Sequence, residues 1–439
     1  MARLLRAAQS RLVSDRALLA LVAVTVVGGV LRLAWVIVAT RRPVGFHDPT
    51  FYLQYAEAIA RGDGFVRPGG EPTAYYPVGY PALLAIPVAL VVHTPIPDNL
   101  PAVASGLNVV AGTVGVALMG VLGRRLVGPA AGTAAAAVVA FYPNLILHTA
   151  AVLTETVFCA VFAGVLVVLL WHRPDELSPR RIALGGALLG VATLIRPIVL
   201  VLLPAFALAW WWWRRRETDR LGRRLAILAV TCVGVVVPWT LRNAFVMDTV
   251  TFIGTNTGDN LCIGNNPEAT GGFMLPDFCF GDFQEIGDHH VEARRNRALT
   301  GRALDWAVGH LDQQPRLVFW RTFWTFAHDH DGLRAVQSYE EDQWVPSAWQ
   351  TFLGTTSDGY YFAAMGLGLL GLVRLARRPD PRLRFVAVAA VALTVTVWPF
   401  FGDARFHIPV SFLLCVPAGA AITRVLDATS RRAAASASS

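Results

Sequence analysis

Charge is scarce in this sequence, and lysine is missing from it altogether. Only 15% of the 439 residues are charged, and all 38 basic residues are arginine, whereas soluble globular proteins carry roughly 25% charged residues. By contrast, 54% of the residues are hydrophobic and the mean hydropathy is +0.49. So much apolar surface cannot be hidden in soluble cores and must face lipid. These values exclude a soluble enzyme, a secreted domain and a disordered scaffold, and they predict a polytopic membrane protein.

Cysteine is also rare, with five in the chain. Cys159, Cys232 and Cys415 lie in apolar runs, where a thiol packs as a small apolar side chain. Cys262 and Cys279 share a polar segment. These two can form one disulfide if that segment faces an oxidising compartment, and the sequence leaves open whether they do.

Apolar runs follow one another through most of the chain, and a membrane-spanning helix needs about 20 such residues. The first run is too long for the apolar core of a signal peptide and has no clear cleavage site. The candidate runs are 17–39, 78–93, 101–122, 129–147, 151–171, 182–195, 197–213, 225–240, 358–376, 385–400 and 406–426.

Arginine clusters between these runs indicate which loops are cytoplasmic. They occur at 3–16, 124–125, 173–181, 214–224, 374–384 and 424–432. If all are cytoplasmic, each interval between them contains an even number of crossings. The proline-containing run 78–93 is then a re-entrant or juxtamembrane helix on the outer side, and 182–213 is a hairpin that turns at Arg196 and Pro197. The sequence therefore predicts an all-α protein of about ten spans in the cell membrane, with both termini cytoplasmic.

This topology divides the chain into four parts. They are a transmembrane module at 1–240 with a first outer loop at 40–100, a mixed extracytoplasmic loop region at 241–357, C-terminal transmembrane helices at 358–426 and a cytoplasmic tail at 427–439. The arginine clusters at the membrane account for the net charge of +8, so we expect no nucleic-acid partner. Most polar residues of interest fall on the outer side.

The first outer loop contains a candidate catalytic acid, Asp48. Asp48 precedes Pro49, as a helix N-cap precedes proline at the first helical position. An apolar stripe that includes Tyr52 follows, and Gly62 or Gly64 ends the helix. The pattern predicts an amphipathic helix at the membrane surface. Asp48 is then either a cap alone or a general base at the mouth of the bundle, and capping lowers a carboxyl pKa and weakens a base.

A second acid, Glu155, lies one turn into the span that starts at the outer face. Ionisable residues inside spans are costly and are functional candidates for that reason. The alternative is a carboxylate that binds loop amides at the interface. Arg196, at the tip of the predicted hairpin, lies near the same depth and would offset the charge of Glu155.

Polar residues near the ends of later spans are candidates for substrate binding. Arg405 starts a span at headgroup depth, followed by His407, and its guanidinium is suited to a phosphate or to a partner such as Asp403. Arg242 opens the large outer segment, in which Asn265 and Asn266 lie in a Gly- and Asn-rich stretch. Amide side chains suit hydroxyl-rich or phosphate ligands, but Gly and Asn are also ordinary turn residues.

Two short stretches have the ligand density of a metal site. They are His328–Asp331 and Asp288–His290. Neither has a defined zinc spacing, so surface polar clusters are the favoured interpretation.

Together these positions resemble the GT-C superfamily of membrane glycosyltransferases, above all the family 39 protein O-mannosyltransferases and the related aminoarabinose transferases. The resemblance runs along most of the chain, and it depends on the order and sidedness of short motifs. These are Asp48 with Tyr52, Ala56 and Gly62, then Tyr76–Pro81, Gly123–Leu126, Thr154–Thr156, Leu194–Pro197, Trp239–Asn243, Ile263–Pro267 and Arg405–Pro409.

The resemblance implies a transferase that uses a polyprenyl-monophosphate sugar on the outer face of the membrane. Asp48 matches the first-loop catalytic acid, and Glu155 matches a second acid across the cavity. Arg405 and Arg242 would hold the lipid phosphate. The wider set of expected substrate-binding residues adds Arg196, Tyr52, Tyr76, Asn265, Asn266 and His407.

The sequence also departs from these families. Asp48 is followed by Pro49 instead of Glu, and Tyr75–Tyr76 stands where aminoarabinose transferases have a Glu-Lys pair. An acid that helps to bind metal there is missing, so no cofactor is expected to be required. A divalent metal stays possible, with His328 and His330 as weak candidate ligands.

The chemistry fits these residues independently. A phosphate ester is a good leaving group, so one general base suffices, and attack from the opposite face inverts the anomeric carbon. Partners would be the donor, membrane lipid and a hydroxyl acceptor on a protein, a lipid or a cell-envelope glycan, with a mannose- or arabinose-type sugar. A transporter or lipid flippase would place its acids near the midplane and show internal repeats, which we do not find. A non-catalytic subunit for polysaccharide assembly is a third alternative.

Overall fold

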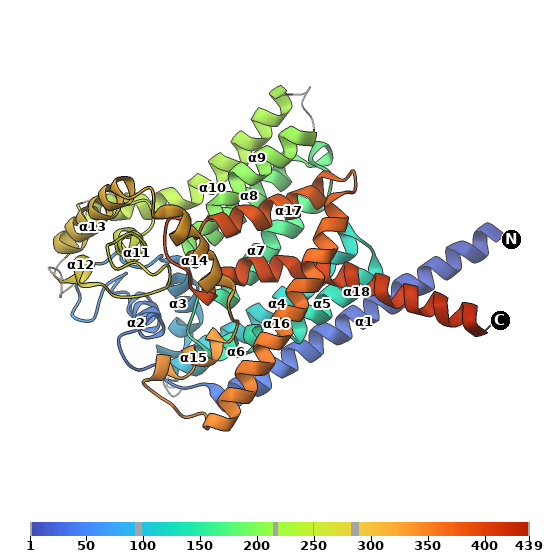
Figure 1. The fold of residues 1–439 in the computed structure, drawn as a ribbon, viewed down its shortest axis with the longest axis horizontal. Coiled ribbons are helices and arrows are strands. Elements are labelled where there is room, and N and C mark those ends of the chain that lie inside the picture. The colour runs from blue at the N-terminus through green and yellow to red at the C-terminus, as the bar shows by residue number, and fades with distance from the viewer. Residues whose placement is uncertain (1, 93–98, 214–217, 249, 282–288, 438–439) are drawn as a thin grey trace.

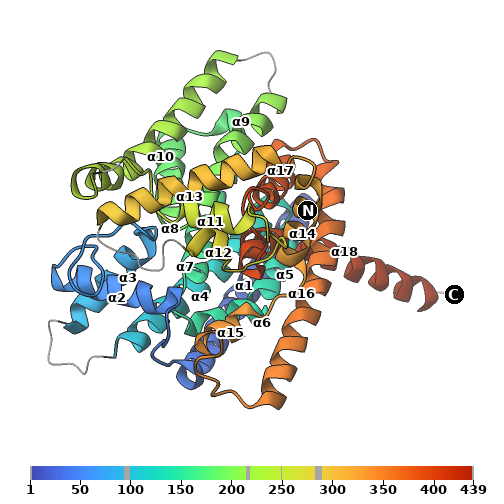
Figure 2. The ribbon, with the colours of Figure 1, turned by 60° about the vertical axis from the view of Figure 1, so that its left-hand side comes forward.

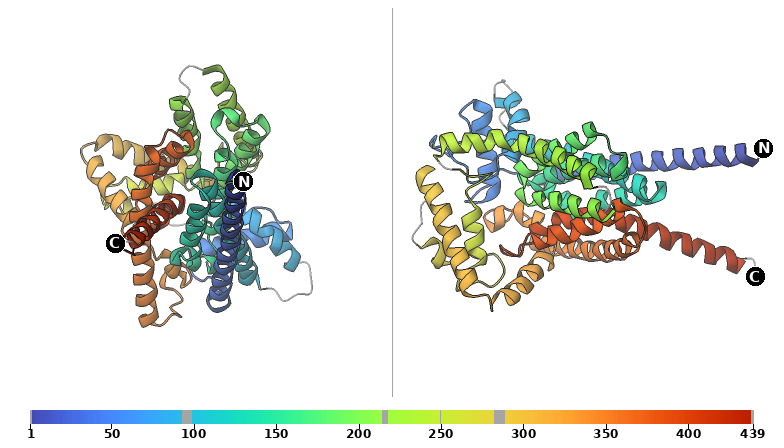
Figure 3. Two further views of the ribbon diagram at one scale, coloured as in Figure 1. Left: turned by 90° about the vertical axis from the view of Figure 1, so that its right-hand side faces the viewer. Right: turned by 90° about the horizontal axis from the view of Figure 1, so that it is seen from above.

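The structure, a computed structural model, describes residues 2–92, 99–213, 218–248, 250–281 and 289–437. These residues form helices and connecting segments, without a β-strand; two isolated bridges join Val66 to Pro72 and Gly272 to Gly402. The helices make an elongated bundle with both chain ends at one end of it (Figures 1 and 3). The shorter helices gather at the opposite end.

The bundle confirms the multi-pass membrane architecture. Its helices are α1 (Ala2–Ala39), α4 (Leu100–Leu126), α5 (Pro129–Ala140), α6 (Pro143–Leu147), α7 (Glu155–Leu170), α8 (Pro179–Ile195), α9 (Leu202–Trp213), α10 (Thr218–Val246), α16 (Ser347–Ala376), α17 (Pro381–Val395) and α18 (Ile408–Ala437). Within the described ranges, five helices are long and apolar enough to cross a membrane, or six if the bent pair at 129–150 is one span. The count of ten spans stays a prediction.

Burial separates the centre of the bundle from its lipid-facing rim. The candidate span at the start of α18 has 78% of its residues buried, whereas the apolar stretch of α10 has 17%. Large apolar side chains such as Ile37, Val230 and Leu370 are exposed. In water such exposure would be unfavourable, and in a bilayer these side chains contact lipid tails.

Several of the predicted runs differ from the helices of the structure. The predicted span 129–147 is bent by 60° between α5 and α6. Two carbonyls at this break accept hydrogen bonds from Arg32, at 3.0 Å for Val139 O and 3.2 Å for Ala140 O, so a buried arginine of α1 caps the broken helix. In addition, α10 continues to Val246, and α16 begins at Ser347 rather than at 358.

The shorter helices lie at the end of the bundle opposite the termini (Figure 1), and Figure 2 turns this end toward the viewer. They are α2 (Asp48–Arg61), α3 (Gly79–Val92), α11 (Thr257–Gly264), α12 (Asp277–Phe280), α13 (His289–Gly309), α14 (Gln314–Phe326) and α15 (Asp331–Ala335). A disulfide between Cys262 and Cys279 joins α11 to α12, a pairing that the sequence allowed but left open. The run 78–93 forms the short helix α3, whereas its last residue lies outside the described residues.

Helix α2 is the predicted amphipathic helix of the first loop. Its buried residues include Tyr52, Leu53 and Ala56, and Gly62 ends it with φ +92°, a left-handed conformation that glycine adopts without strain. The N-cap residue is His47, and Asp48 is the first residue of the helix. No side-chain hydrogen bond caps this helix, so the carboxylate of Asp48 is available for other partners.

Candidate active site

Arg405 is the centre of a charged cluster at the end of the bundle opposite the termini. Its Nη1 donates to Asp48 Oδ2 at 2.9 Å, and its Nε donates to Glu155 Oε1 at 2.8 Å. A third carboxylate, Asp331, has Oδ2 at 3.9 Å from the same Nε. Three acids from distant parts of the chain therefore meet one guanidinium.

The segment before α18 places this arginine. Asp403 accepts the backbone N–H of Arg405 at 2.9 Å, and Gly402 N donates to Gly271 O at 2.7 Å. Asp403 therefore caps the turn instead of neutralising the guanidinium. This leaves the side chain of Arg405, which is 15% exposed, for the three acids.

Asp48 is the most accessible acid of the cluster, with 30% of its side chain exposed. The hydroxyl of Tyr76 donates to its Oδ1 at 2.7 Å. Burial holds the pKa of Tyr76 well above its ordinary value, so this phenol stays protonated and donates. Tyr52 packs edge-on against Tyr76, with ring centroids 5.1 Å apart. The two predicted tyrosines thus form an aromatic support for the carboxylate.

Glu155 has a different environment, because its side chain is fully buried. Besides Arg405, Arg196 Nη1 lies 3.1 Å from its Oε1, and Thr154 Oγ1 lies 3.3 Å from its Oε2. Helix α8 ends at Ile195, so the break predicted at Pro197 brings Arg196 to this acid. A buried carboxylate between two guanidiniums is a fixed anion that orients both cations.

Sequence reasoning missed Asp331 as a member of the cluster. It begins α15, and the backbone N–H of Gly332 donates to Asn144 Oδ1 at 2.9 Å, which holds α15 against α6. A Cβ at Gly332 would lie 2.6 Å from His148 Nδ1, so only glycine permits this approach. Burial raises the pKa of Asp331 to about 7. Asp331 belongs to the stretch His328–Asp331, for which a surface polar cluster was the favoured interpretation.

Four other predicted binding residues lie outside the cluster. Arg242 donates to Thr73 O at 2.7 Å and to Phe65 O at 3.0 Å, which ties α10 to the first loop. The Asn265 amide donates to Pro399 O, and the Asn266 amide donates to Cys262 O.

His407 is fully buried, with Nε2 at 3.5 Å from Asp329 Oδ1 and its ring against Tyr361. All four of these side chains therefore have contacts that hold segments together, and a ligand-binding role for them stays a prediction.

The weak metal candidates are engaged in other contacts. His330 Nδ1 lies 3.0 Å from both carboxylate oxygens of Asp358, and the His328 ring stacks on His330. Among the described residues, Asp248, His289 and His290 are the group of three side chains close enough to share an ion, and they are exposed or half-buried. Asp288, the other member of that predicted stretch, lies outside the described residues.

The arrangement of the bundle defines the class of fold. No family model matches the chain, and no curated protein matches it. Among solved structures it is similar to ArnT from Cupriavidus metallidurans bound to undecaprenyl phosphate, with a TM-score of 0.56, 15% identity and 94% of this chain covered. It is also similar to the archaeal oligosaccharyltransferase AglB from Archaeoglobus fulgidus in complex with an inhibitory peptide and a dolichol-phosphate, with a TM-score of 0.50, 15% identity and 96% covered.

These likenesses confirm the resemblance at the level of the fold: the chain has the fold of the GT-C membrane glycosyltransferases. The chain spans 60% of the length of the ArnT structure and 52% of that of the AglB structure. The shared part is therefore the membrane bundle with its short helices, and the chemistry of this chain has to be argued from its own residues.

Proposed function

We propose that this protein is an inverting glycosyltransferase that moves a sugar from a polyprenyl-monophosphate donor to a hydroxyl acceptor. The observation that carries the proposal is the ion pair between the partly exposed Asp48 and Arg405, backed by the buried Glu155. Base and cation lie beside each other at the end of a membrane bundle, where a lipid-linked donor and a hydroxyl acceptor would meet.

In this proposal Asp48 is the general base. Its carboxylate takes the proton of the acceptor hydroxyl while the oxygen attacks the anomeric carbon from the face opposite the phosphate. The bond between that carbon and the phosphate oxygen breaks, and the sugar inverts. Such base catalysis contributes typically 10²–10⁴-fold to a rate. Asp48 suits this role because it is the most accessible carboxylate of the cluster.

The departing lipid phosphate gains negative charge, and Arg405 is the group that meets it. A phosphate oxygen would replace Asp48 as a partner of Nη1, which would free the base at the moment it is needed. Glu155 acts in this scheme as a positioning residue that keeps Arg405 and Arg196 in place, since its side chain has no exposed surface. The resemblance matched Glu155 to a second acid across the cavity, and the proposal gives that acid a positioning role.

The orientation in the membrane follows from the arginine clusters. Both termini and the arginine-rich loops would be cytoplasmic, which leaves the Arg405 cluster on the outer face. The polyprenyl tail would lie against apolar side chains of the bundle, and its burial would supply most of the donor affinity.

The test is a product assay with the purified protein and radiolabelled polyprenyl-phosphate sugars of mannose, arabinose and glucose type. Membrane lipids and envelope polymers serve as acceptors, and the Asp48→Asn variant is assayed beside the wild type. We expect label transfer that the variant has lost and an inverted anomeric configuration in the product. If no donor supports transfer by folded wild-type protein, the proposal is wrong.

A further inference from the structure

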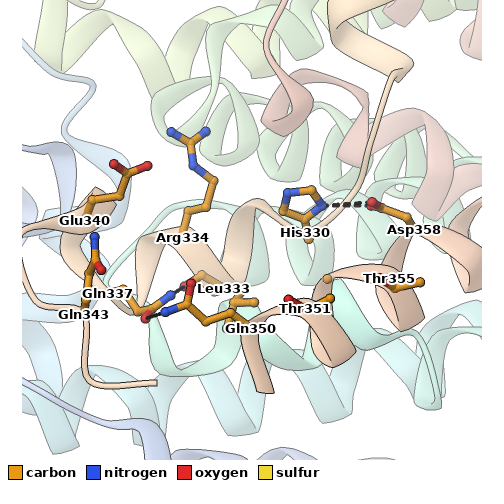
Figure 4. A pocket seen from close by; sticks show the side chains of 11 residues that line it. His330, Leu333, Arg334, Gln337, Glu340, Gln343, Gln350, Thr351, Thr355 and Asp358 are labelled. Carbon is orange, nitrogen blue, oxygen red and sulfur yellow. Dashed lines mark hydrogen bonds and ion pairs between the residues drawn. The ribbon is translucent and has the colours of Figure 1, made fainter. Parts of the chain in front are cut away.

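A second polar site adjoins the Arg405 cluster, between α15 and the start of α16. It is a cavity of about 580 Å³, within the range of roughly 300–1,000 Å³ that small-molecule pockets occupy. Side chains of α15, of the segment after it and of α16 line it. In Figure 4, Gln350, Thr351 and Thr355 follow one another along α16, with His330 and Arg334 above them.

The chemistry of the lining selects a hydroxyl-rich ligand. Among the described residues, Leu333 is the single aliphatic side chain that lines the cavity. The uncharged polar groups are three glutamine amides and two threonine hydroxyls: Gln337, Gln343, Gln350, Thr351 and Thr355. Amides and hydroxyls donate and accept hydrogen bonds at one position, as sugar hydroxyls do. The amides of Gln337 and Gln350 and the hydroxyl of Thr351 already donate to protein oxygens. Their remaining lone pairs, together with Gln343 and Thr355, give the cavity a polar lining that suits sugar hydroxyls better than a polyprenyl tail or an acyl chain.

The charges of the lining argue against a phosphate. Within the described part of the chain, Arg334 is the only arginine that lines the cavity, and it is balanced by Glu340 and by Asp358, which also holds His330 at 3.0 Å. These side chains provide no excess positive charge for an anion. The guanidiniums of Arg405 and Arg196 lie in the neighbouring cluster instead. The lipid phosphate and the ligand of this cavity therefore have separate places.

The cavity and the cluster share α15. Arg334 lines the cavity, and its Nη1 lies 3.7 Å from Asp331 Oδ1, whose other oxygen faces Arg405. The turn that follows is strained, with φ of +48°, +51° and +85° at Ser338, Tyr339 and Glu340. Tyr339 points its hydroxyl at Asp331, while Glu340 lines the cavity. Non-glycine residues adopt such backbone angles mainly where the surroundings impose them, often at functional sites.

We infer that this cavity binds the carbohydrate part of the acceptor, an uncharged oligosaccharide whose terminal hydroxyl is presented to Asp48. The inference rests on the proposed function and names its acceptor class as a glycan. The volume exceeds the needs of one monosaccharide, so the cavity holds several rings next to the reacting hydroxyl.

A matched pair of glycine variants on α16 tests the inference. A Cβ at Gly354 meets only His330 Cγ, at 3.8 Å, so the side chain of Gly354→Leu grows into the cavity. Gly359, on the same helix, is exposed with no atom within 4 Å of an added Cβ, and Gly359→Leu is the control. Both changes replace glycine by a better helix former, and equal melting temperatures would show that both variants fold.

Binding is measured on the full chain in detergent by saturation-transfer NMR, with neutral tetrasaccharides of mannose, arabinofuranose and glucose as probes. We expect at least one tetrasaccharide to bind the wild type and Gly359→Leu equally, and Gly354→Leu at least tenfold more weakly. Absence of binding to the folded wild type, or equal binding to both variants, would overturn the inference.

Kinetics separate this inference from the proposed function. In the transfer assay, Gly354→Leu should raise the KM for the glycan acceptor about tenfold and leave the KM for the donor unchanged. If Gly354→Leu raises only the KM for the donor, the cavity belongs to the donor sugar. If, in the binding assay, serine-containing peptides bind in place of the tetrasaccharides, the cavity belongs to a protein acceptor. Either result overturns the inference. Tetrasaccharide binding that depends on Gly354, in a wild type without transfer, would support the glycan site and contradict the transferase.

Discussion

Two carboxylate–arginine clusters lie at the same end of the molecule, one around Arg405 and one around Glu292 of α13. Glu292 is 2% exposed, and Thr73 Oγ1 and Ala74 N donate to it at 2.8 and 2.9 Å. Arg67 and Thr255 also contact its carboxylate. Both of its oxygens are therefore occupied by fixed groups of the protein. Asp48, by contrast, is held by Tyr76 and Arg405 and has a partly exposed side chain.

This difference separates acids that hold the fold together from acids that can react. The partners of Glu292 come from the first loop and from the segment before α11, so this acid holds these segments and α13 together. The Glu292 carboxylate therefore has no lone pair left for a substrate. Asp48 has accessible surface, and one of its partners is a cation that a phosphate can draw away. The same residue types thus stabilise at one place and are suited to chemistry at the other.

The sharpest test of this comparison is Asp48→Asn. An amide cannot take the acceptor proton, so we expect transfer to fall by about 10³-fold, within the range for loss of a general base. The melting temperature should stay close to that of the wild type, because the amide oxygen of the variant can still accept from the Tyr76 hydroxyl. Turnover and thermal unfolding of the same preparation check both parts, and retained turnover would refute the assigned base.

Glu292→Ala should show the opposite pattern. Removing one partner of a buried ion pair costs about 3–5 kcal/mol, because Arg67 and the neighbouring donors lose their acceptor. We expect a clearly lower melting temperature, while the KM for donor in the fraction that stays folded is unchanged. An unaltered melting temperature would contradict the structural role of this cluster.

The disulfide between Cys262 and Cys279 should also affect stability and leave the chemistry intact. It closes a loop with a sequence separation of 17, and a loop of this length gains about 3 kcal/mol in the chain-entropy account. The double variant Cys262→Ser, Cys279→Ser should melt earlier, and a reducing agent should lower the melting temperature of the wild type alone. A wild type insensitive to reduction would show that the bond does not contribute.

Two arginines that the sequence offered as phosphate ligands can be separated by experiment. Arg405→Ala should weaken donor binding by about 30-fold, equivalent to roughly 2 kcal/mol for a charged hydrogen bond. Arg242→Ala should leave donor binding nearly unchanged, since Arg242 binds carbonyls of the first loop. Titration with a fluorescent polyprenyl phosphate measures both, and the reverse order would move the phosphate site to α10.

The smallest effect is expected for Asp331→Asn, as a change in pH dependence. The pKa of Asp331 is raised to about 7 by burial, so the neutral form predominates below that pH. As the pH rises through 7, the ionised acid competes for Arg405, and donor affinity should fall a few-fold in the wild type and stay flat in the variant. The pKa of Asp331 is higher in the folded than in the unfolded protein. Its contribution to the free energy of unfolding is therefore fully present below about pH 4 and is lost as the pH rises from about 4 to 7.

Part of the candidate site was predictable because its signals are local. Asp48 precedes an amphipathic helix, Glu155 and Arg405 stand at the ends of apolar runs, and Arg196 precedes a proline. Each departs from its immediate neighbours in polarity. Asp331 and Glu292 carry no such signal, since each lies in a polar stretch where an acid is unremarkable. Asn265, Asn266 and His407 have ligand-like chemistry, yet their contacts are with the protein itself.

The sequence by itself determined that the chain is a multi-pass membrane protein and roughly where its apolar helices lie, since apolar runs of sufficient length form helices wherever they meet a bilayer. It also determined that arginine, and never lysine, supplies the cations. Only the tertiary structure decided that Arg405 joins Asp48 across 357 residues and Glu155 across 250, and that α5 bends at the point where Arg32 caps it. The physical reason is that the helix pattern is set by local hydrophobicity, whereas the pairing of charges depends on how distant helices pack.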